Sequence, residues 1–488
     1  MVLSFGAGYG TLRTMPRFAW RPVAAITLAT IAVLAVTATQ YGLHRDELYF
    51  LVLSHHPAWG YVDQPPVTPM LIRLSTELFG DAPWAVRLPA IILGPAAIPV
   101  LALLARELGG ARAAQVLAAA GGFCAFVLVS GHLILTTTLD IPLSGLAMLF
   151  VVRALRTSPR WWLAVGVVTG LSLYNKQLIP MLLLGIAAGL LIAGPRRMLV
   201  SPWLWAGVIV AVIGGLPNLL YQLTHDFPQL DMASALAQDK GGDNRALFLP
   251  LQIVLFGATL VPVIVAGFVA LIRDARLRCI AWAYLVVVVF VLVSGSAPYY
   301  TFGLMMPMFA AGCVATAKWA EGRGGRWTFV VAGVVVSEAL GAVVALPLLP
   351  VDVLKNTPIG AINQTAPDQI GWPRYVQQIV AARPPGAPII ANNYGEYGAL
   401  EYQGVRDVYS GHNQLRYYGG PPDSATVVLA VGFDNPVALR QLFASCTDAG
   451  SLDSGTGVDN EEQGRVIWVC RDPVAPWPTL WPQFYHYS

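Results

Sequence analysis

The first 350 residues of the chain contain eleven apolar segments separated by short polar loops. A helix of about 20 apolar residues crosses the roughly 30 Å hydrocarbon core of a membrane. Only 12% of the residues are charged, whereas soluble domains carry roughly 25%. The pattern predicts a polytopic α-helical membrane protein with about eleven transmembrane helices. We expect them at residues 23–39, 84–104, 113–134, 141–152, 161–174, 178–193, 203–221, 248–272, 279–293, 302–317 and 327–349.

Positive residues are shared unevenly between alternate loops. With a cytoplasmic N-terminus, the inner loops hold sixteen Lys and Arg residues and the outer loops hold six. Because short cytoplasmic loops are enriched in positive residues, we expect a plasma-membrane protein whose segment after about residue 350 is extracytoplasmic. The 23–39 segment lacks a small-residue cleavage site and is expected to be a retained helix. The sixteen residues are Arg13, Arg17, Arg21, Arg106, Arg112, Arg153, Arg156, Arg160, Arg196, Arg197, Arg273, Arg276, Arg278, Lys318, Arg323 and Arg326.

The composition changes near residue 351. Charged residues become more frequent, and no later apolar run reaches spanning length. We therefore expect a transmembrane domain at 1–350 and a small extracytoplasmic soluble α/β domain at 351–488. Short apolar runs between turn residues predict buried strands and amphipathic helices. The predicted strands are 388–391, 426–431 and 465–470, and the predicted helices are 372–382 and 436–444.

The five cysteines fall into two groups. Three lie in predicted spans, where a small buried apolar residue is the ordinary role. Cys446 and Cys470 lie in the expected exported domain, where the redox environment permits a disulfide. We predict a bridge between these two residues, and a pair of free thiols is the alternative.

The first outer loop, 40–83, carries the densest group of polar residues. Asp46 and Glu47 directly follow the first span, and the turn YVDQPP comes at 61–66. Helix capping is the alternative role for the two acids, but it does not explain the tyrosine, histidines and rigid turn beside them. We expect this loop to be catalytic, with Asp46 and Glu47 as catalytic residues. Tyr61, Asp63 and Gln64 are expected to bind substrate.

The same loop contains two apolar stretches, at 48–53 and 67–78. Their length and their position beside polar residues are typical of helices that lie in the membrane interface. We therefore expect both stretches to be interfacial helices.

Two further outer segments carry isolated ionisable residues. Asp140, in TTTLDIP at 136–142, could cap the next span or act as a second carboxylate beside Asp46. Lys176, in YNKQ at 174–177, is one of four lysines in the chain. It could extend to the lipid headgroups or bind a phosphate as a point charge. We expect a catalytic role for Asp140 and a phosphate-binding role for Lys176.

Other outer residues complete the candidate site. An aromatic-belt role is the favoured alternative for a tyrosine pair at the membrane boundary. The added candidates are Arg45 and Arg73 for donor-phosphate binding, and His225, Tyr299 and Tyr300 for substrate binding.

The outer loops thus combine acids with scattered cations at one membrane face. The chain contains no phosphate-binding glycine loop, dinucleotide fingerprint or Cys-x-x-Cys pair, so nucleotide-driven chemistry is not expected. A net charge of +3 gives no reason to expect nucleic-acid binding. This pattern favours transfer of a sugar from a polyprenyl phosphate, because the lipid phosphate is already a good leaving group. A cation would steady its charge, while one carboxylate would take the acceptor proton and give inversion.

Two other functions remain open at this point. A transporter or flippase of lipid-linked saccharides would use buried ionisable residues along a pathway. The chain shows no clear repeat between its halves, and its acids gather at one outer loop, which counts against transport. A scaffold whose C-terminal domain binds envelope partners is the third hypothesis.

These motifs resemble those of bacterial membrane glycosyltransferases with the GT-C fold. The most similar group is glycosyltransferase family 39 with its relatives, the protein O-mannosyltransferases and the aminoarabinose transferases that modify lipid A. The resemblance covers roughly residues 20–320 and extends to NYGE at 393–396 and SGHN at 410–413. It implies that Asp46 is the catalytic base with Glu47 as its neighbour. It also implies that Asp140 is a second essential acid and that Lys176 lies near the donor phosphate.

The resemblance also implies substrates and cofactors. Donors in this family are polyprenyl-phosphate sugars, and acceptors are cell-envelope lipids, glycans or proteins. The C-terminal domain differs from the sugar-binding insertion of the eukaryotic mannosyltransferases, which weakens the case for a protein acceptor. No cofactor is expected to be required, although His55, His56 and Glu47 could together bind a divalent metal.

Overall fold

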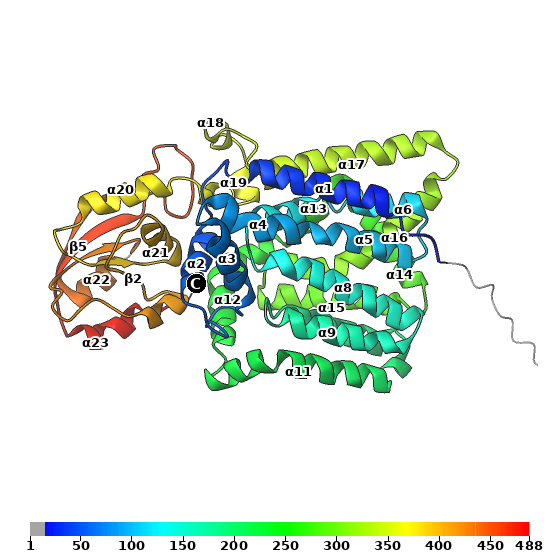
Figure 1. Ribbon diagram of the computed structural model, residues 1–488, viewed down its shortest axis with the longest axis horizontal. Helices are drawn as coiled ribbons and strands as arrows, with labels where there is room; N and C mark the ends of the chain where they lie inside the picture. Colours follow the sequence, from blue (N-terminus) through cyan, green and yellow to red (C-terminus); the bar gives the residue numbers. More distant parts are fainter. Residues whose placement is uncertain (1–14, 435, 488) are drawn as a thin grey trace, which may run out of the picture.

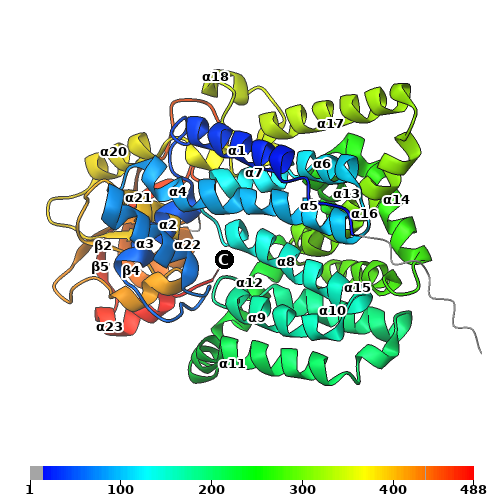
Figure 2. The same ribbon diagram turned by 45° about the vertical axis from the view of Figure 1, so that its right-hand side comes forward.

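The structure is a computed structural model that describes residues 15–434 and 436–487. A bundle of long helices forms one side of the molecule and a small sheet domain forms the other (Figure 1). Helix α2 (Arg45–His55) and helix α3 (Val67–Phe79) of the first outer loop lie between them, and the turned view keeps this order (Figure 2). Arg13, one of the basic residues counted above, lies outside the described residues.

Each of the eleven predicted apolar segments is helical in the structure. Helix α1 begins at the end of the bundle away from the sheet domain, and α17 ends near that domain (Figure 1). Within the described residues, six helices are long and apolar enough to cross a membrane, or up to eight if each bent pair is one span. The number eleven therefore stays a prediction. The bundle helices are α1 (Trp20–Thr37), α4 (Pro83–Leu93), α5 (Ala97–Glu107), α6 (Arg112–Ala120), α7 (Ala125–His132), α8 (Thr137–Arg156), α9 (Trp162–Ser172), α10 (Ile179–Ile192), α11 (Pro202–Thr224), α13 (Phe248–Phe256), α14 (Val261–Arg273), α15 (Arg278–Ser294), α16 (Phe302–Ala320) and α17 (Gly324–Ala345).

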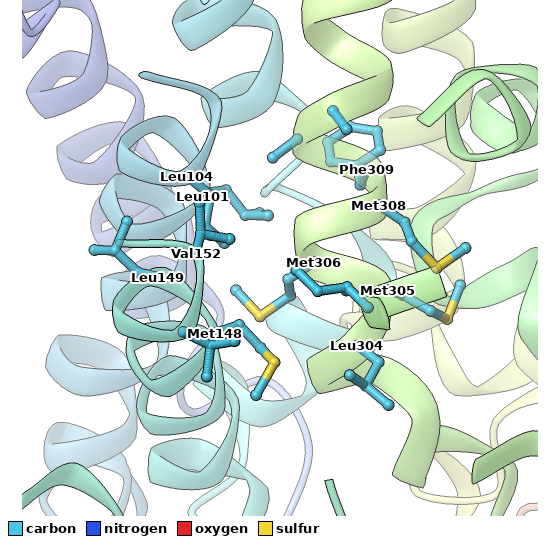
Figure 3. Packing of buried hydrophobic residues seen from close by; sticks show 14 of the residues in the cluster. Leu101, Leu104, Met148, Leu149, Val152, Leu304, Met305, Met306, Met308 and Phe309 are labelled. Atoms are coloured by element: carbon cyan, nitrogen blue, oxygen red, sulfur yellow. The ribbon is translucent and has the colours of Figure 1, made fainter. Parts of the chain in front are cut away.

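The core of the bundle lies around α16. Figure 3 shows Met306 of α16 facing Met148 of α8, with Leu101 of α5 beside them, and all three are fully buried. Lipid tails are as apolar as these side chains, so association of the helices depends on close van der Waals packing. Flexible methionine side chains fill the irregular spaces that remain between the helices.

Helices α14 and α16 approach most closely at glycines. A Cβ atom on Gly312 would overlap the carbonyl oxygen of Val263. We therefore expect Gly312→Val to push the helices apart and to lower the free energy of unfolding by about 2 kcal/mol. The melting temperature in detergent should fall by several degrees. Gly333→Val is the control, because its Cβ would meet only Thr259, at 3.9 Å. Equal melting temperatures for the two variants would refute the packing argument.

The sheet domain has five strands in the order β2-β1-β3-β5-β4. β1 pairs in parallel with β2 and β3, whereas β5 pairs antiparallel with β3 and β4. All three predicted strands are present, and helices cover the sheet as expected of an α/β layer. The elements are α18 (Val351–Leu354), α19 (Ile359–Ile362), α20 (Trp372–Ala382), β1 (Ile389–Ala391), α21 (Tyr394–Tyr402), β2 (Val408–Tyr409), β3 (Val427–Val431), α22 (Pro436–Leu442), β4 (Phe443–Ser451), β5 (Val466–Pro473) and α23 (Trp477–Leu480).

Two details of this domain bear on the sequence predictions. The predicted helix at 436–444 is too long, because β4 already begins at Phe443 and pairs with Pro473 of β5. Cys446 of β4 lies directly opposite Cys470 of β5, and a disulfide joins them. The expected bridge therefore links the edge strand to its neighbour.

The two loop helices differ from each other in their surroundings. The apolar residues of α2, including Leu48 and Leu53, are buried in a core shared with the sheet domain. The expectation of an interfacial helix at 48–53 is therefore wrong for α2, because the sheet domain covers it. In α3, Leu74 and Leu78 are exposed, so this helix keeps an apolar face that could meet lipid.

Candidate active site

Helix α2 begins with a capping box that fixes Glu47. The Glu47 carboxylate accepts the backbone N–H of His44 at 2.9 Å, and Nδ1 of His44 accepts the backbone N–H of Asp46 at 3.1 Å. Burial lowers the pKa of His44, so its ring stays neutral and Nδ1 is free to accept. This reciprocal arrangement satisfies two backbone donors at the start of the helix.

Glu47 also forms a fully buried ion pair with Arg87 of α4. Nη2 of Arg87 donates to the carboxylate at 2.7 Å, and Nε donates at 3.0 Å. The same guanidinium donates to the carbonyls of Ala38 and Gly42. A carboxylate that is buried and fully hydrogen-bonded cannot approach a substrate, and loss of either partner would leave an uncompensated charge. Glu47 thus anchors the start of α2 to the bundle, and its expected catalytic role stays an untested prediction.

The neighbouring carboxylate, Asp46, is oriented but accessible. Its side chain is 33% exposed, and it accepts a hydrogen bond of 2.8 Å from the hydroxyl of Tyr394 in α21. Burial, and then the Asp46 carboxylate itself, raise the pKa of Tyr394 well above its usual value. The phenol therefore keeps its proton and acts as a donor. The sheet domain thus fixes one side of Asp46 and leaves the other side open.

A second group of predicted residues meets at the bundle end that faces α2. Nζ of Lys176 donates to the hydroxyl of Tyr299 at 3.3 Å and lies 4.9 Å and 5.3 Å from the ring centroids of Tyr299 and Tyr300. Asp140, in the first turn of α8, is within electrostatic reach of Lys176. Tyr299 is within electrostatic reach of both Asp140 and Asp46. Asp46, Asp140, Lys176 and the two tyrosines therefore form one cluster.

The YVDQPP turn lies beside this cluster. The buried hydroxyl of Tyr61 donates to the carbonyl of Leu53 at 3.1 Å, so Tyr61 holds the loop, and its expected role in substrate binding stays a prediction. Asp63 is within electrostatic reach of Asp46. In the described part of the chain, Oδ1 of Asp63 and both amide atoms of Gln64 are buried without a hydrogen-bond partner. Such atoms are costly unless a ligand or water satisfies them.

The ionisation of Asp63 gives a testable pH dependence. Burial raises its pKa from 3.8 to about 6, so the folded state binds this proton more tightly than the unfolded state. This contribution to stability is present below pH 3.8 and is lost as the pH rises to about 6. We expect Asp63→Asn to abolish this pH-dependent loss of stability, which is on the order of 1 kcal/mol for a partly exposed carboxylate.

Thermal melting between pH 4 and pH 8 measures this effect. The variant should melt a few degrees above the wild type at high pH and show a flatter profile. Asp81→Asn, at an exposed position, is the matched control. Parallel profiles for the wild type and Asp63→Asn would rule out the buried-carboxylate explanation.

Two predicted residues lie away from the cluster, and a third, Arg45, lies beside it. Arg45 is buried in an ion pair with Glu461 of the sheet domain, and its guanidinium carbon lies 5.0 Å from the ring centroid of Tyr394, which holds Asp46. Arg73 pairs with Glu77 on the exposed face of α3, at 2.7 Å. His225 is exposed at the end of α11 and stacks on Tyr221. Arg45 ties α2 to the sheet domain and Arg73 belongs to a surface pair. The phosphate-binding role expected for both arginines stays a prediction.

The three residues considered as metal ligands also do not converge. His55 lies 3.3 Å from Glu401, His56 stacks on Tyr418 at 4.3 Å, and Glu47 is occupied by its arginine. Across residues 15–434 and 436–487, no group of three or more His, Cys, Asp or Glu residues is arranged to hold a metal ion. The His55, His56 and Glu47 site is thus not formed.

Reasoning from the sequence did not assign a role to two residues near the site. Tyr394, which orients Asp46 from 348 positions away in the chain, was noted only as part of NYGE at 393–396. Its signal was indirect: Asn393 and Glu396 form a capping box at the start of α21, and this spacing is visible in the sequence. Arg87 was counted only as an outer positive charge, because nothing in its own segment indicates that it pairs with Glu47.

The fold now defines the class of protein. The chain is a multi-pass membrane protein with the GT-C fold of the membrane glycosyltransferases. Residues 63–221 match the model of the family described as dolichyl-phosphate-mannose-protein mannosyltransferase. These findings confirm the resemblance that the motifs indicated, to glycosyltransferases of the protein mannosyltransferase and aminoarabinose transferase type.

Particular relatives can also be named. The chain is 24% identical over 366 residues to undecaprenyl phosphate-alpha-4-amino-4-deoxy-L-arabinose arabinosyl transferase 1 of Pseudomonas fluorescens, and the match covers 68% of this chain and 63% of that protein. The crystal structure of apo ArnT from Cupriavidus metallidurans gives a TM-score of 0.62 at 15% identity, over 92% of this chain and 97% of that one. The same protein bound to undecaprenyl phosphate gives a TM-score of 0.57 at 17% identity, over 91% and 97%.

Proposed function

We propose that the protein is an inverting glycosyltransferase that moves a sugar from a polyprenyl phosphate to a cell-envelope acceptor at the outer face of the plasma membrane. The observation that carries this proposal is the cluster of Asp46, Asp140, Lys176 and Tyr299. It combines an accessible carboxylate with a cation at the bundle end that faces the sheet domain. The names of the matched arabinosyl transferase and of the structure bound to undecaprenyl phosphate support the donor class.

In the reaction, Asp46 takes the proton of the acceptor hydroxyl. The acceptor oxygen forms a bond to the anomeric carbon, while the bond from that carbon to the phosphate oxygen breaks on the opposite face. This in-line displacement inverts the anomeric centre. The polyprenyl phosphate leaves with the electron pair of the broken bond, and the proton passes from Asp46 to water.

Lys176 stabilises the charge that grows on the leaving phosphate. Its Nζ lies against two tyrosine rings and beside a buried carboxylate, so it is held in place before the donor binds. A preorganised cation in a site of low dielectric stabilises developing charge without reorganising. Within the described part of the chain, Asp140 forms no direct ion pair with Lys176 and acts on it only through its charge at longer range, whereas Tyr394 positions Asp46 through a hydrogen bond.

The orientation of the site follows from the positive-inside rule and from the outer position assigned to the sheet domain. The donor lipid would enter between bundle helices with its phosphate near Lys176. Binding the long lipid tail would position the sugar relative to Asp46 and so lower the entropic cost of reaction. The acceptor would be a membrane lipid, a glycan or a protein of the cell envelope.

A reconstitution experiment tests the function as a whole. Purified protein in vesicles receives polyprenyl-phosphate sugar and a cell-envelope fraction from a strain that lacks this protein. We expect loss of the lipid-linked sugar, release of polyprenyl phosphate and an acceptor product whose anomeric configuration, determined by NMR, is opposite to that of the donor. Movement of intact donor across the bilayer without release of phosphate would instead support a flippase.

A further inference from the structure

A group of tyrosines surrounds Arg416 at the edge of the sheet domain. The guanidinium carbon lies 4.0 Å from the ring centroid of Tyr487, 5.7 Å from that of Tyr485 and 5.8 Å from that of Tyr417. Contacts at these distances hold a guanidinium flat against aromatic faces. Tyr417 is nevertheless 63% exposed, so one ring face stays open to a ligand. The tyrosines therefore form a rigid wall that is only partly covered.

This wall continues onto the membrane bundle. Tyr221, near the end of α11, is within electrostatic reach of Tyr417, Tyr487 and Asp63. A Cβ built on Gly60 would lie 2.8 Å from Tyr221 Cγ, so the first outer loop passes directly over this ring. A glycine at position 60 permits that close approach. The sheet domain, the bundle and the catalytic loop thus meet at one aromatic surface. His225 stacks on the Tyr221 ring at 4.1 Å, so Tyr221 supports this surface and Tyr417 provides its open ring.

The aromatic surface lies next to the proposed reaction site. Asp63 is within electrostatic reach of Arg416 on one side and of Asp46 on the other. Among the described residues, Oδ1 of Asp63, Nη2 of Arg416 and both amide atoms of Gln64 are buried without a hydrogen-bond partner. These atoms include both donors and acceptors, so a ligand that offers both could satisfy them.

The chemistry of this surface selects one class of ligand. A sugar hydroxyl both donates and accepts, so one hydroxyl could satisfy Asp63 while another satisfies Arg416 or Gln64. The apolar C–H face of a pyranose or furanose ring packs on an aromatic ring as other flat apolar groups do. We propose that Arg416 and Tyr417, supported by Tyr221 and Tyr487, form the acceptor subsite and that the acceptor is a neutral saccharide. This inference rests on the function proposed above.

Charge argues against an anionic acceptor. Asp46 and Asp63 are within electrostatic reach of each other, and Asp231 of α12 (Pro228–Ala246) is within electrostatic reach of Tyr487. Against these three acids the subsite itself offers Arg416, because Lys176 of the Asp46 cluster is assigned to the donor phosphate and Arg45 is paired with Glu461. A phosphorylated glycolipid would gain Arg416 but would bring its own negative charge toward three carboxylates. A hydroxyl-bearing neutral glycan meets no such repulsion.

The test measures which acceptor is used and how tightly it binds. Vesicles that contain the full-length protein are mixed with membranes of a deletion strain that carry the labelled donor. The neutral polysaccharide, phosphorylated glycolipid and protein fractions of the envelope of that strain are added in separate reactions. We expect label to enter the neutral polysaccharide. In Tyr417→Ala, KM for that fraction should rise about tenfold or more, the loss expected when a stacked ring is removed, with KM for the donor unchanged.

Tyr402→Ala is the matched control, because Tyr402 is an exposed tyrosine whose hydroxyl donates to the carbonyl of Asp81, on another side of the loop. Its acceptor KM should equal that of the wild type. Entry of label into the phosphorylated or protein fraction, or an unchanged acceptor KM in Tyr417→Ala, overturns the inference while leaving the transfer function intact. A wild-type protein that transfers sugar to no fraction would overturn the proposed function itself.

Discussion

Replacing Asp46 by asparagine is expected to abolish sugar transfer while leaving the protein folded. The amide has the shape of the carboxylate, and its oxygen can still accept the 2.8 Å hydrogen bond from Tyr394. It cannot take a proton from the acceptor hydroxyl. General-base catalysis contributes about 10²–10⁴-fold to a rate, so kcat for transfer should fall by that factor.

The measurement is single-turnover transfer from labelled donor in vesicles, beside binding of unlabelled polyprenyl phosphate. Binding of the lipid phosphate should be unchanged, because Lys176 and not Asp46 lies against the tyrosine rings. Asp352→Asn, at a position with an 88% exposed side chain, controls for the loss of a carboxylate as such. Wild-type kcat in the Asp46 variant would disprove the base assignment.

Glu47→Gln distinguishes the role of Glu47 from that of Asp46, because its main effect should be on stability rather than on the rate of transfer. Because Glu47 is fully buried against Arg87, its replacement should act on folding, and breaking a buried ion pair costs about 3–5 kcal/mol. Activity per folded molecule should change less than in the Asp46 variant. The two carboxylates thus have different roles, although they are adjacent in the chain.

The sequence could not separate these two acids. Both occupy the first turn of a helix after a span, where capping and catalysis predict the same residue types. Their roles diverge because successive residues on a helix point about 100° apart. This rotation turns Glu47 toward Arg87 and Asp46 toward Tyr394. The partners lie 40 and 348 positions away, so only the tertiary fold reveals them.

Most of the membrane fold was predictable, because apolar length directly reports helices that must bury their backbone in lipid. The cluster of Asp140, Lys176 and Tyr299 could also be predicted, since each residue lies at the outer end of a predicted span. The sheet domain was harder. Its five strands include a two-residue strand, β2, and an exposed edge strand, β4, which show little apolar pattern. Arg416 belongs to a short 3-10 helix between these strands and gave no signal.

Replacing Lys176 by methionine is expected to weaken donor binding by about 10- to 100-fold. Methionine keeps the unbranched apolar stem against Tyr299 and Tyr300 but removes the charge. A hydrogen bond to a charged group contributes about 1.5–3 kcal/mol, which corresponds to that change in affinity. KM for the donor should rise, and binding of polyprenyl phosphate, measured by its displacement of labelled lipid, should weaken in parallel.

The design must separate phosphate binding from folding, because Lys176→Met leaves the buried Asp140 without its cation. The double variant Lys176→Met/Asp140→Asn removes both charges, so it should recover thermal stability without recovering donor affinity. Lys240→Met removes the charge of a different lysine, one that pairs with Glu461 at 3.4 Å, and should bind donor normally. If the double variant regained full donor affinity, Lys176 would act only by balancing Asp140, and the phosphate would have to be bound by another group. If donor binding by the double variant stays weak while its stability recovers, the lysine charge itself holds the leaving group, because stability and binding will have been uncoupled in one protein.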